Sequence, residues 1–225
     1  MAYFCNMIIN QITVLLQKDL NLELKRPFLF NGMLLYLVST VFVCYLVFDG
    51  IVDTKTWNAL YWIILLFAAV NSAGRSFSEE FSRRHLYYYT LAGPTAFIIG
   101  KMLYNVLLLT ILSLLGFLAF MVFLGFPAES KSMFLLAAVA GSIGLALLLT
   151  LVAGIAARAE HNFTLMAILS FPIVLPKLLI LINLTQNALY EAQWSLAIKP
   201  LIALLAMYFL IIVLAVVLFP YLWKE

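Results

Sequence analysis

The stretch LLLTILSLLGFLAFMVFL, residues 107–124, decides the fold, because it carries no charge over a length that can cross a membrane. An α-helix needs about 20 such residues to span roughly 30 Å of hydrocarbon. In lipid the backbone must satisfy its own hydrogen bonds, which favours a helix. Strands of a transmembrane barrel would instead be about ten residues long and alternate in hydrophobicity. The stretch therefore predicts a transmembrane helix.

The rest of the chain has the same character. Of its 225 residues 66% are hydrophobic, 15% are aromatic and 10% are charged, and the mean hydropathy is +1.10. Soluble domains are only about 45–50% apolar. We expect an all-α polytopic membrane protein, built as one transmembrane domain over residues 1–225, with residues 1–28 preceding a six-helix bundle in 29–222. The predicted spans are residues 29–48, 58–71 with a continuation to 76, 95–124, 133–157, 163–184 and 199–222.

The basic residues are distributed unequally between the two sets of loops. If the N-terminus is cytoplasmic, nine Lys and Arg residues lie in or near inner loops and three in outer loops, leaving out Lys177 inside a span. Basic residues collect on the cytoplasmic side of membrane proteins. Both termini are therefore predicted to be cytoplasmic. The inner set is Lys18, Lys25, Arg26, Arg75, Arg83, Arg84, Lys101, Arg158 and Lys224, and the outer set is Lys55, Lys131 and Lys199.

The first 26 residues differ from a secretory signal peptide, because their positive charges follow the apolar stretch. At helical spacing four apolar residues share one face, which predicts an amphipathic helix in the membrane interface. Arg26 lies within reach of Asp19 and Glu23. This helix either anchors the first span or contacts a cytoplasmic partner. The apolar face consists of Ile9, Ile12, Leu16 and Leu20.

The segment RSFSEEFSRRHLYYYTLAGP, residues 75–94, concentrates charge between spans two and three. Phe77 and Phe81 share one face at helical spacing and charged residues cover the rest, which predicts a short cytoplasmic helix ended by Gly93 and Pro94. Two readings stay open. The charges either form a solvated turn that holds topology, or a docking helix whose apolar edge fits a groove of a soluble protein.

Signatures of catalysis or metal binding are scarce. GPTAFIIGKM, residues 93–102, places six residues between its glycines, whereas a phosphate-binding loop needs four. His85 and His161 are isolated in predicted loops, and Cys5 and Cys44 have no metal-ligand spacing. We expect no catalytic residue, no metal site and no nucleotide site in the chain itself.

Lys177 is the ionisable residue inside a span, in FPIVLPKLLIL, residues 171–181. A charge within a span is costly and marks a functional candidate. Its long side chain either extends to the outer interface or faces a cavity or substrate. Pro172 and Pro176 each remove a backbone donor and are expected to kink or break the same helix.

Span four carries small residues at four-residue spacing, Ala137 with Gly141 and Ala140 with Gly144. Such pairs allow helices to approach closely. They form either a packing face within the chain or a contact with a second copy of it.

Three blocks together resemble the haem exporter B subunits of cytochrome c maturation, which are ABC-2 type permeases. They are KDLNLELKRP at residues 18–27, RSFSEEFSRRHLYYYTLAGPTAFIIGKM at 75–102, and ILSFPIVLPKLLI at 168–180. Tyr87, Tyr88 and Tyr89 replace a mainly aliphatic run, and Lys177 stands where an apolar residue is usual. The resemblance covers most of the chain in the same order.

The resemblance implies a multi-pass protein of the bacterial inner membrane without ATPase activity of its own. Its implied partners are an ABC ATPase that binds ATP, a haem-handling membrane subunit and a haem chaperone, with no nucleic acid. It also implies that residues 75–94 hold a coupling helix for the ATPase. ATP hydrolysis would drive haem export or release of the loaded chaperone. The alternatives are a permease for a polysaccharide, lipid or drug, and a non-transporting assembly factor. The implied coupling residues are Arg75, Phe77, Glu79, Glu80, Phe81, Arg83 and Arg84.

Overall fold

The computed structural model describes residues 2–25, 28–81, 93–127, 130–158, 163–190 and 193–224. Within these ranges the chain forms α-helices and no β-strand, which confirms the predicted all-α fold. The helices are α1 (Ala2–Lys25), α2 (Phe28–Val47), α3 (Thr54–Phe81), α5 (Pro94–Phe123), α6 (Lys131–Arg158), α7 (Phe163–Tyr190) and α8 (Trp194–Lys224).

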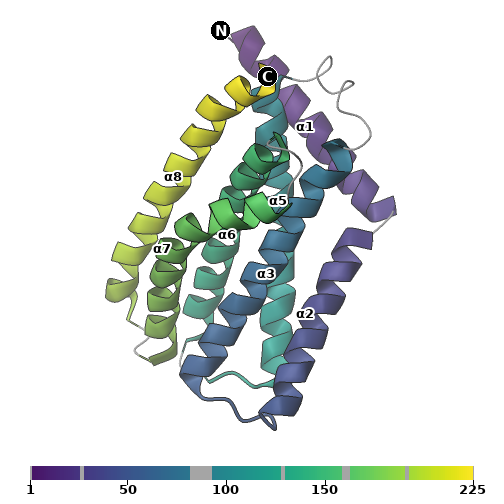
Figure 1. Ribbon diagram of the computed structural model, residues 1–225. Coiled ribbons are helices and arrows are strands. Elements are labelled where there is room, and N and C mark those ends of the chain that lie inside the picture. Colours follow the sequence, from purple (N-terminus) through teal and green to yellow (C-terminus); the bar gives the residue numbers. More distant parts are fainter. Residues whose placement is uncertain are drawn as a thin grey trace.

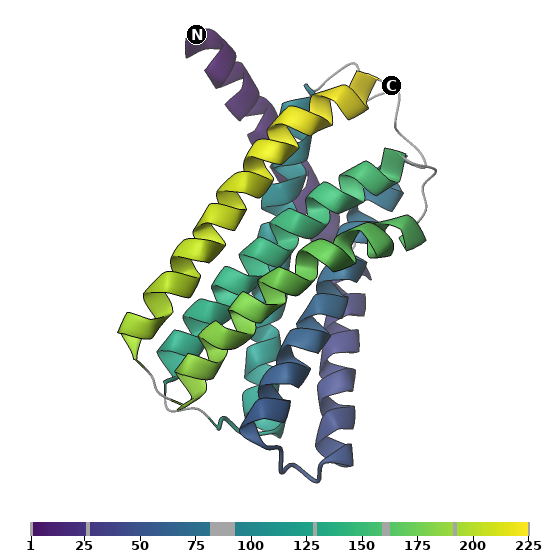
Figure 2. The same cartoon turned by 60° about the vertical axis from the view of Figure 1, so that its left-hand side comes forward.

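All of these helices except α1 are long and apolar enough to cross a membrane, which confirms the six predicted spans. Successive spans run in opposite directions along the bundle (Figure 1). Helix α1 lies obliquely across one end of the bundle, and both views place the N- and C-termini at that end (Figures 1 and 2). We call this the terminal end and the other the distal end.

Helix α6 lies at the centre of the bundle. Of its apolar span 72% is buried within the protein, against 17% for each of α2 and α8, which form the periphery. It contacts α3, α5, α7 and α8. Small buried side chains, among them Ala137 and Ala138, allow this many neighbours to approach one helix.

An aromatic cluster closes the distal end. It consists of Trp57, Tyr61, Phe117, Phe120, Phe126 and Phe134, contributed by α3, α5, α6 and the turn after α5. The Trp57 ring centroid lies 5.1 Å from that of Phe120 and 5.1 Å from that of Phe134, both edge to face. Trp57 Nε1 donates to the carbonyl of Gly125 at 3.1 Å. Gly125 takes a φ of +70°, which glycine adopts without steric penalty.

The predicted bounds of one span need correction, and one alternative for another helix is excluded. The second span was expected at residues 58–71 or 58–76, but α3 covers Thr54–Phe81. Its extra turns carry Arg75, Glu79 and Glu80, because a helix keeps its internal hydrogen bonds after it leaves the hydrocarbon. Pro172 and Pro176 do not break α7, which continues from Phe163 to Tyr190. Its first turns lie across the bundle before it turns along the bundle axis (Figure 1), a bend typical of proline.

Candidate functional site

The first part of the segment at residues 75–94 continues α3 instead of forming a separate helix. Phe77 is 1% exposed, so its ring does not form part of an exposed aromatic edge, as was expected. Its ring lies 6.3 Å from that of Phe97 of α5, and Phe97 stacks on Phe219 of α8 at 6.0 Å. These rings join three helices at the terminal end.

Gly154 of α6 completes this contact. A Cβ atom at Gly154 would lie 3.1 Å from the Phe219 ring and 3.4 Å from the Phe77 ring. The missing side chain therefore lets both rings pack directly on α6. Helices α3, α5, α6 and α8 therefore all meet at this point.

Other predicted coupling residues have different positions. Arg75 is exposed, and its guanidinium faces α2 near Gly32. The backbone of Glu79, Glu80 and Phe81 belongs to the last turn of α3. The side chains of those three residues, and the whole of Arg83, Arg84 and His85, lie outside the described residues. Their contribution to coupling stays a prediction.

Helix α5 begins directly after this segment and is fixed to α1 at once. Gly93 is its N-cap in an extended conformation, and Pro94 occupies the first turn, where no backbone donor is needed. The Gly93 N–H donates to Gln11 Oε1 at 3.3 Å. A Cβ atom at Gly100 would lie 3.4 Å from Cβ of Leu15, so the two helices are in close contact.

A buried ion pair strengthens the contact between α1 and α5. Lys101 Nζ lies 3.0 Å from Asp19 Oδ2, with the two side chains 6% and 8% exposed. Asp19 also pairs with Lys18 at 3.0 Å. We call the contacts of Asp19 and Glu23 with α5 and α2 the α1 clamp.

Glu23 provides the second half of the α1 clamp. Its Oε2 accepts from the Tyr104 hydroxyl at 3.1 Å and its Oε1 from the Phe30 N–H at 2.8 Å. Arg26, which is within reach of both acids in the sequence, lies outside the described residues, so its pairing with them stays a prediction. Asp19 and Glu23 are four residues apart and Lys101 and Tyr104 three apart. This matched helical spacing was the signal available in the sequence.

The predicted apolar face of α1 is found in part. Ile12, Leu16 and Leu20 are half-buried against the bundle, whereas Ile9 is exposed. The face of α1 that contacts α5 also includes Asp19 and Glu23, so this face is not purely apolar. That α1 lies in the membrane interface stays a prediction.

Lys177 does not extend to the outer interface. Its side chain is 0% exposed, and Nζ lies 4.9 Å from the centre of the Tyr208 ring of α8. Among the described residues Nζ has no hydrogen-bond partner. A charge at the centre of a span costs roughly 2.5–3.5 kcal/mol. Lys177 therefore does not extend to the outer interface, and its role toward a cavity or substrate stays a prediction.

Gly141 and Gly144 pack helices of the same chain. A Cβ atom at Gly141 would collide with the Trp62 ring, and one at Gly144 with Lys177 Nζ and the Tyr208 ring. These two glycines therefore make room for large side chains from α3, α7 and α8. In this structure they form an intrachain packing face and not an exposed one for a second copy.

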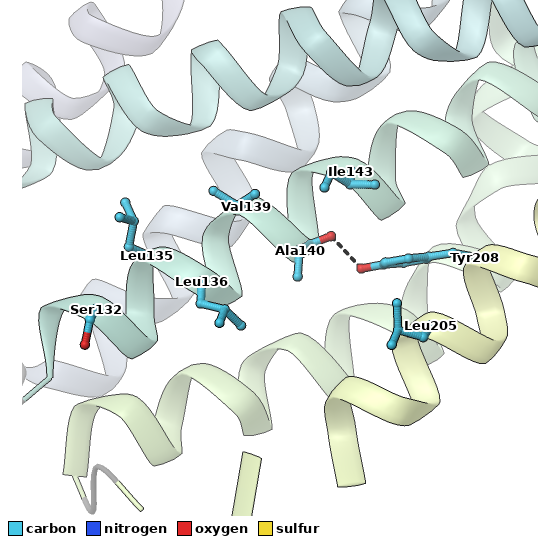
Figure 3. A pocket seen from close by; sticks show the side chains of 8 residues that line it. All are labelled: Ser132, Leu135, Leu136, Val139, Ala140, Ile143, Leu205 and Tyr208. Atoms are coloured by element: carbon cyan, nitrogen blue, oxygen red, sulfur yellow. Dashed lines mark hydrogen bonds between the residues drawn. The ribbon is translucent and has the colours of Figure 1, made fainter. Parts of the chain in front are cut away.

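A groove lies between α6 and α8, on the side of Tyr208 (Figure 3). Its volume is about 550 Å³ and its lining is almost entirely apolar. The Tyr208 hydroxyl donates to the carbonyl of Ala140 and holds the ring at the end of the groove. The lining residues are Ser132, Leu135, Leu136, Val139, Ala140, Ile143, Leu205 and Tyr208.

Within the described ranges no group of three or more His, Cys, Asp or Glu residues is placed to hold a metal ion. His161, like His85, lies outside those ranges. Polar side chains pair across helices, such as Asn105 with Thr150 at 2.9 Å.

Six spans, with the buried helix α6 at the centre of the other five, define a multi-pass membrane protein. A sequence model of the CcmB protein family matches residues 10–221, nearly the whole chain, and the chain belongs to this family. No curated protein and no solved structure gives a significant match.

CcmB proteins are the haem exporter B family named from the three sequence blocks above. The chain is thus a membrane permease component of the haem exporter for cytochrome c maturation, and the family works in an ABC transporter complex with an ATPase partner. Membership favours this reading over a permease for a polysaccharide, lipid or drug.

Proposed function

We propose that this chain transmits ATP-driven movement of a cytoplasmic ABC ATPase to the bacterial inner membrane through the connection between α3 and α5. The movement drives either haem export or release of the haem-loaded chaperone. A haem-handling membrane subunit and the haem chaperone complete the complex. Both termini are cytoplasmic in this proposal, as the distribution of Lys and Arg predicts.

One observation supports the proposal most strongly. Both helices that flank residues 82–92 are fixed into the bundle within a few residues of that segment, α3 through Phe77 and α5 through Phe97. A partner that moves the segment would therefore move packed helices and not a slack loop. Discrete movement of packed helices is how switching proteins transmit small displacements.

The α1 clamp adds helix α1 to the part of the bundle that the ATPase would move. Lys101 lies two turns after the start of α5, and its ion pair with Asp19 joins α5 to α1. Movement of α5 would therefore carry α1 with it. The proposed unit thus contains α1, the end of α3 and the start of α5, all at the terminal end. This unit is the one that a cytoplasmic partner would contact.

The test is reversal of charge at the end of α3. In the Glu79→Lys/Glu80→Lys double variant we expect normal membrane insertion, with copurification of the ATPase reduced about tenfold or more, which corresponds to about 1.4 kcal/mol or more of lost docking energy. The measurement is the ATPase-to-permease ratio after mild-detergent purification, together with ATP turnover of the complex.

The matched control is Lys55→Glu, a charge reversal in the first turn of the same helix at the distal end, where Lys55 is exposed. It should leave the ATPase-to-permease ratio unchanged. Wild-type ratio and turnover in the double variant would contradict docking at this segment.

A further inference from the structure

Lys177 places a basic side chain deep in the bundle, with no acidic partner among the described residues. It lies near the midpoint of α7 (Phe163–Tyr190), and Nζ has no hydrogen-bond acceptor among the described residues. Its two close neighbours are Gly144, which has no side chain, and the face of the Tyr208 ring. The ring face attracts a cation but supplies no acidic group. A buried ammonium of this kind is complementary to a carboxylate.

Tyr208 separates this ammonium from the groove between α6 and α8. One face of its ring lies over Nζ of Lys177, and the same residue lines the groove. A single hydrogen bond to the carbonyl of Ala140 holds the hydroxyl in place (Figure 3). Rotation of this one side chain would open Lys177 to an occupant of the groove.

We propose that this groove receives a transmembrane helix of a partner membrane subunit, and that an Asp or Glu at the middle of that helix pairs with Lys177 when Tyr208 turns aside. The inference rests on the proposed function in one respect, that the chain works in a complex with other membrane proteins. It does not depend on where the ATPase docks.

The shape of the groove favours a helix as the occupant. Its lining follows α6 from Ser132 to Ile143, about 16 Å at ~1.5 Å per residue, from the distal end towards the middle of the membrane. An apolar groove of this length between two helices suits a third helix laid along it. A pocket for a small molecule usually covers most of its ligand, whereas only α6 and α8 line this groove.

The charge pattern indicates a chain other than this one. All ten acidic residues of this sequence lie outside the middles of the spans, so a second copy has no mid-membrane carboxylate to offer. A phospholipid carries its acidic group at the membrane surface, far from the middle of α7. The partner helix must therefore bring its own acid, which restricts it to a different membrane subunit.

The experiment is site-specific photocrosslinking in the assembled complex. A benzoylphenylalanine probe replaces Leu136, which lines the groove and is 38% exposed. The control probe replaces Leu118 of α5, which is 58% exposed at a comparable distance from the distal end and outside the groove. We expect the Leu136 probe to give a peptide from a membrane-spanning helix that has Asp or Glu near its middle. The Leu118 probe should not give this peptide.

Lys177 variants test the charge pair itself. Lys177→Met should lower the yield of this crosslink about tenfold, since losing one member of a buried pair leaves the other charge unpaired. The crosslink yield should be restored when the two charges are exchanged, with Lys177→Glu in this chain and the acid of the partner helix changed to Lys. If Lys177→Met does not fold, Ile143→Trp fills the groove without touching the charge and should abolish the same crosslink.

Three results would overturn the proposal: crosslinks to lipid or haem alone, a crosslinked helix without a mid-membrane acid, and an unchanged yield in Lys177→Met. Failure of this proposal is distinguishable from failure of the coupling proposal. Lys177→Met should retain the ATPase, whereas Glu79→Lys/Glu80→Lys should lose the ATPase and retain the groove crosslink.

Discussion

At the distal end the aromatic cluster fills the space between α3, α5 and α6 with rings 5–6 Å apart, whereas at the terminal end α1 is fixed to α5 by an ion pair and a few hydrogen bonds. Close-packed rings have few alternative arrangements. Ionic and hydrogen-bonded contacts can be exchanged for contacts with water or a partner. Since Phe77, Phe97 and Phe219 also pack closely at the terminal end, the difference indicates that the distal end is the fixed part of the bundle and that α1 is the element of the terminal end that can move.

The largest effect on stability is expected when the centre of the aromatic cluster is removed. Trp57 is 0% exposed and packs edge to face on three phenylalanines. Trp57→Ala should lower the free energy of unfolding by roughly 3–5 kcal/mol, because the surrounding helices cannot close the cavity. The measurement is reversible unfolding in detergent.

Trp194→Ala is the matched control for this variant. Trp194 is 52% exposed at the start of α8, so its loss should change the free energy of unfolding by no more than about 0.5 kcal/mol. Equal losses from the two tryptophan variants would show that the aromatic cluster does not hold the distal end.

A smaller effect is expected at the α1 clamp. Asp19→Asn removes the carboxylate that pairs with Lys101 and should cost about 1.5–3 kcal/mol, the range for hydrogen bonds to charged groups. The readout specific to the clamp is backbone hydrogen exchange. Exchange should accelerate in α1 and stay unchanged around Trp57.

The double variant Asp19→Asn/Lys101→Met controls for the charge left behind. It should recover part of the stability lost in Asp19→Asn, since the buried ammonium that has lost the Asp19 carboxylate is then absent as well. If backbone hydrogen exchange around Trp57 becomes faster in either variant, the stability of the distal end depends on the α1 clamp.

Hydropathy was enough to predict the six spans, because the cost of exposing polar groups to lipid acts on each helix separately. The extension of α3 to Phe81 was missed, because Arg75, Glu79 and Glu80 end the apolar run but not the helix. Sequence marks where a helix leaves the hydrocarbon. It does not mark where the helix ends.

The contacts between helices were harder to predict, because they depend on how each helix is rotated. Asp19 and Lys101 are 82 residues apart, and no local pattern links them. The position of Lys177 in its span does not decide whether the side chain faces lipid or the bundle. Phe77 was assigned to a docking edge from its charged neighbours, while its own ring packs inward against Phe97.

The smallest expected effect concerns Asp53, which precedes α3 at the distal end. Its Oδ2 accepts from the Thr56 N–H at 3.2 Å, and hydrogen bonds from the Thr56 side chain and backbone lower the pKa of the Asp53 carboxyl. Because the pKa is lower in the folded state, this contribution to stability is complete above the unfolded-state pKa. It is lost as the pH falls through the folded-state pKa.

The melting temperature of the wild-type protein should therefore fall slightly between neutral and acidic pH. In Asp53→Asn this fall should be smaller, because the titrating carboxyl is absent. The variant should leave the hydrogen exchange of α1 unchanged, since the distal end is separate from the α1 clamp. Tyr61 is the titratable residue of the aromatic cluster, and its hydroxyl pairs with Ser113. If Asp53→Asn changes the pH dependence of α1 exchange instead, the two ends are coupled, and the division of the bundle into a fixed and a moving end is wrong.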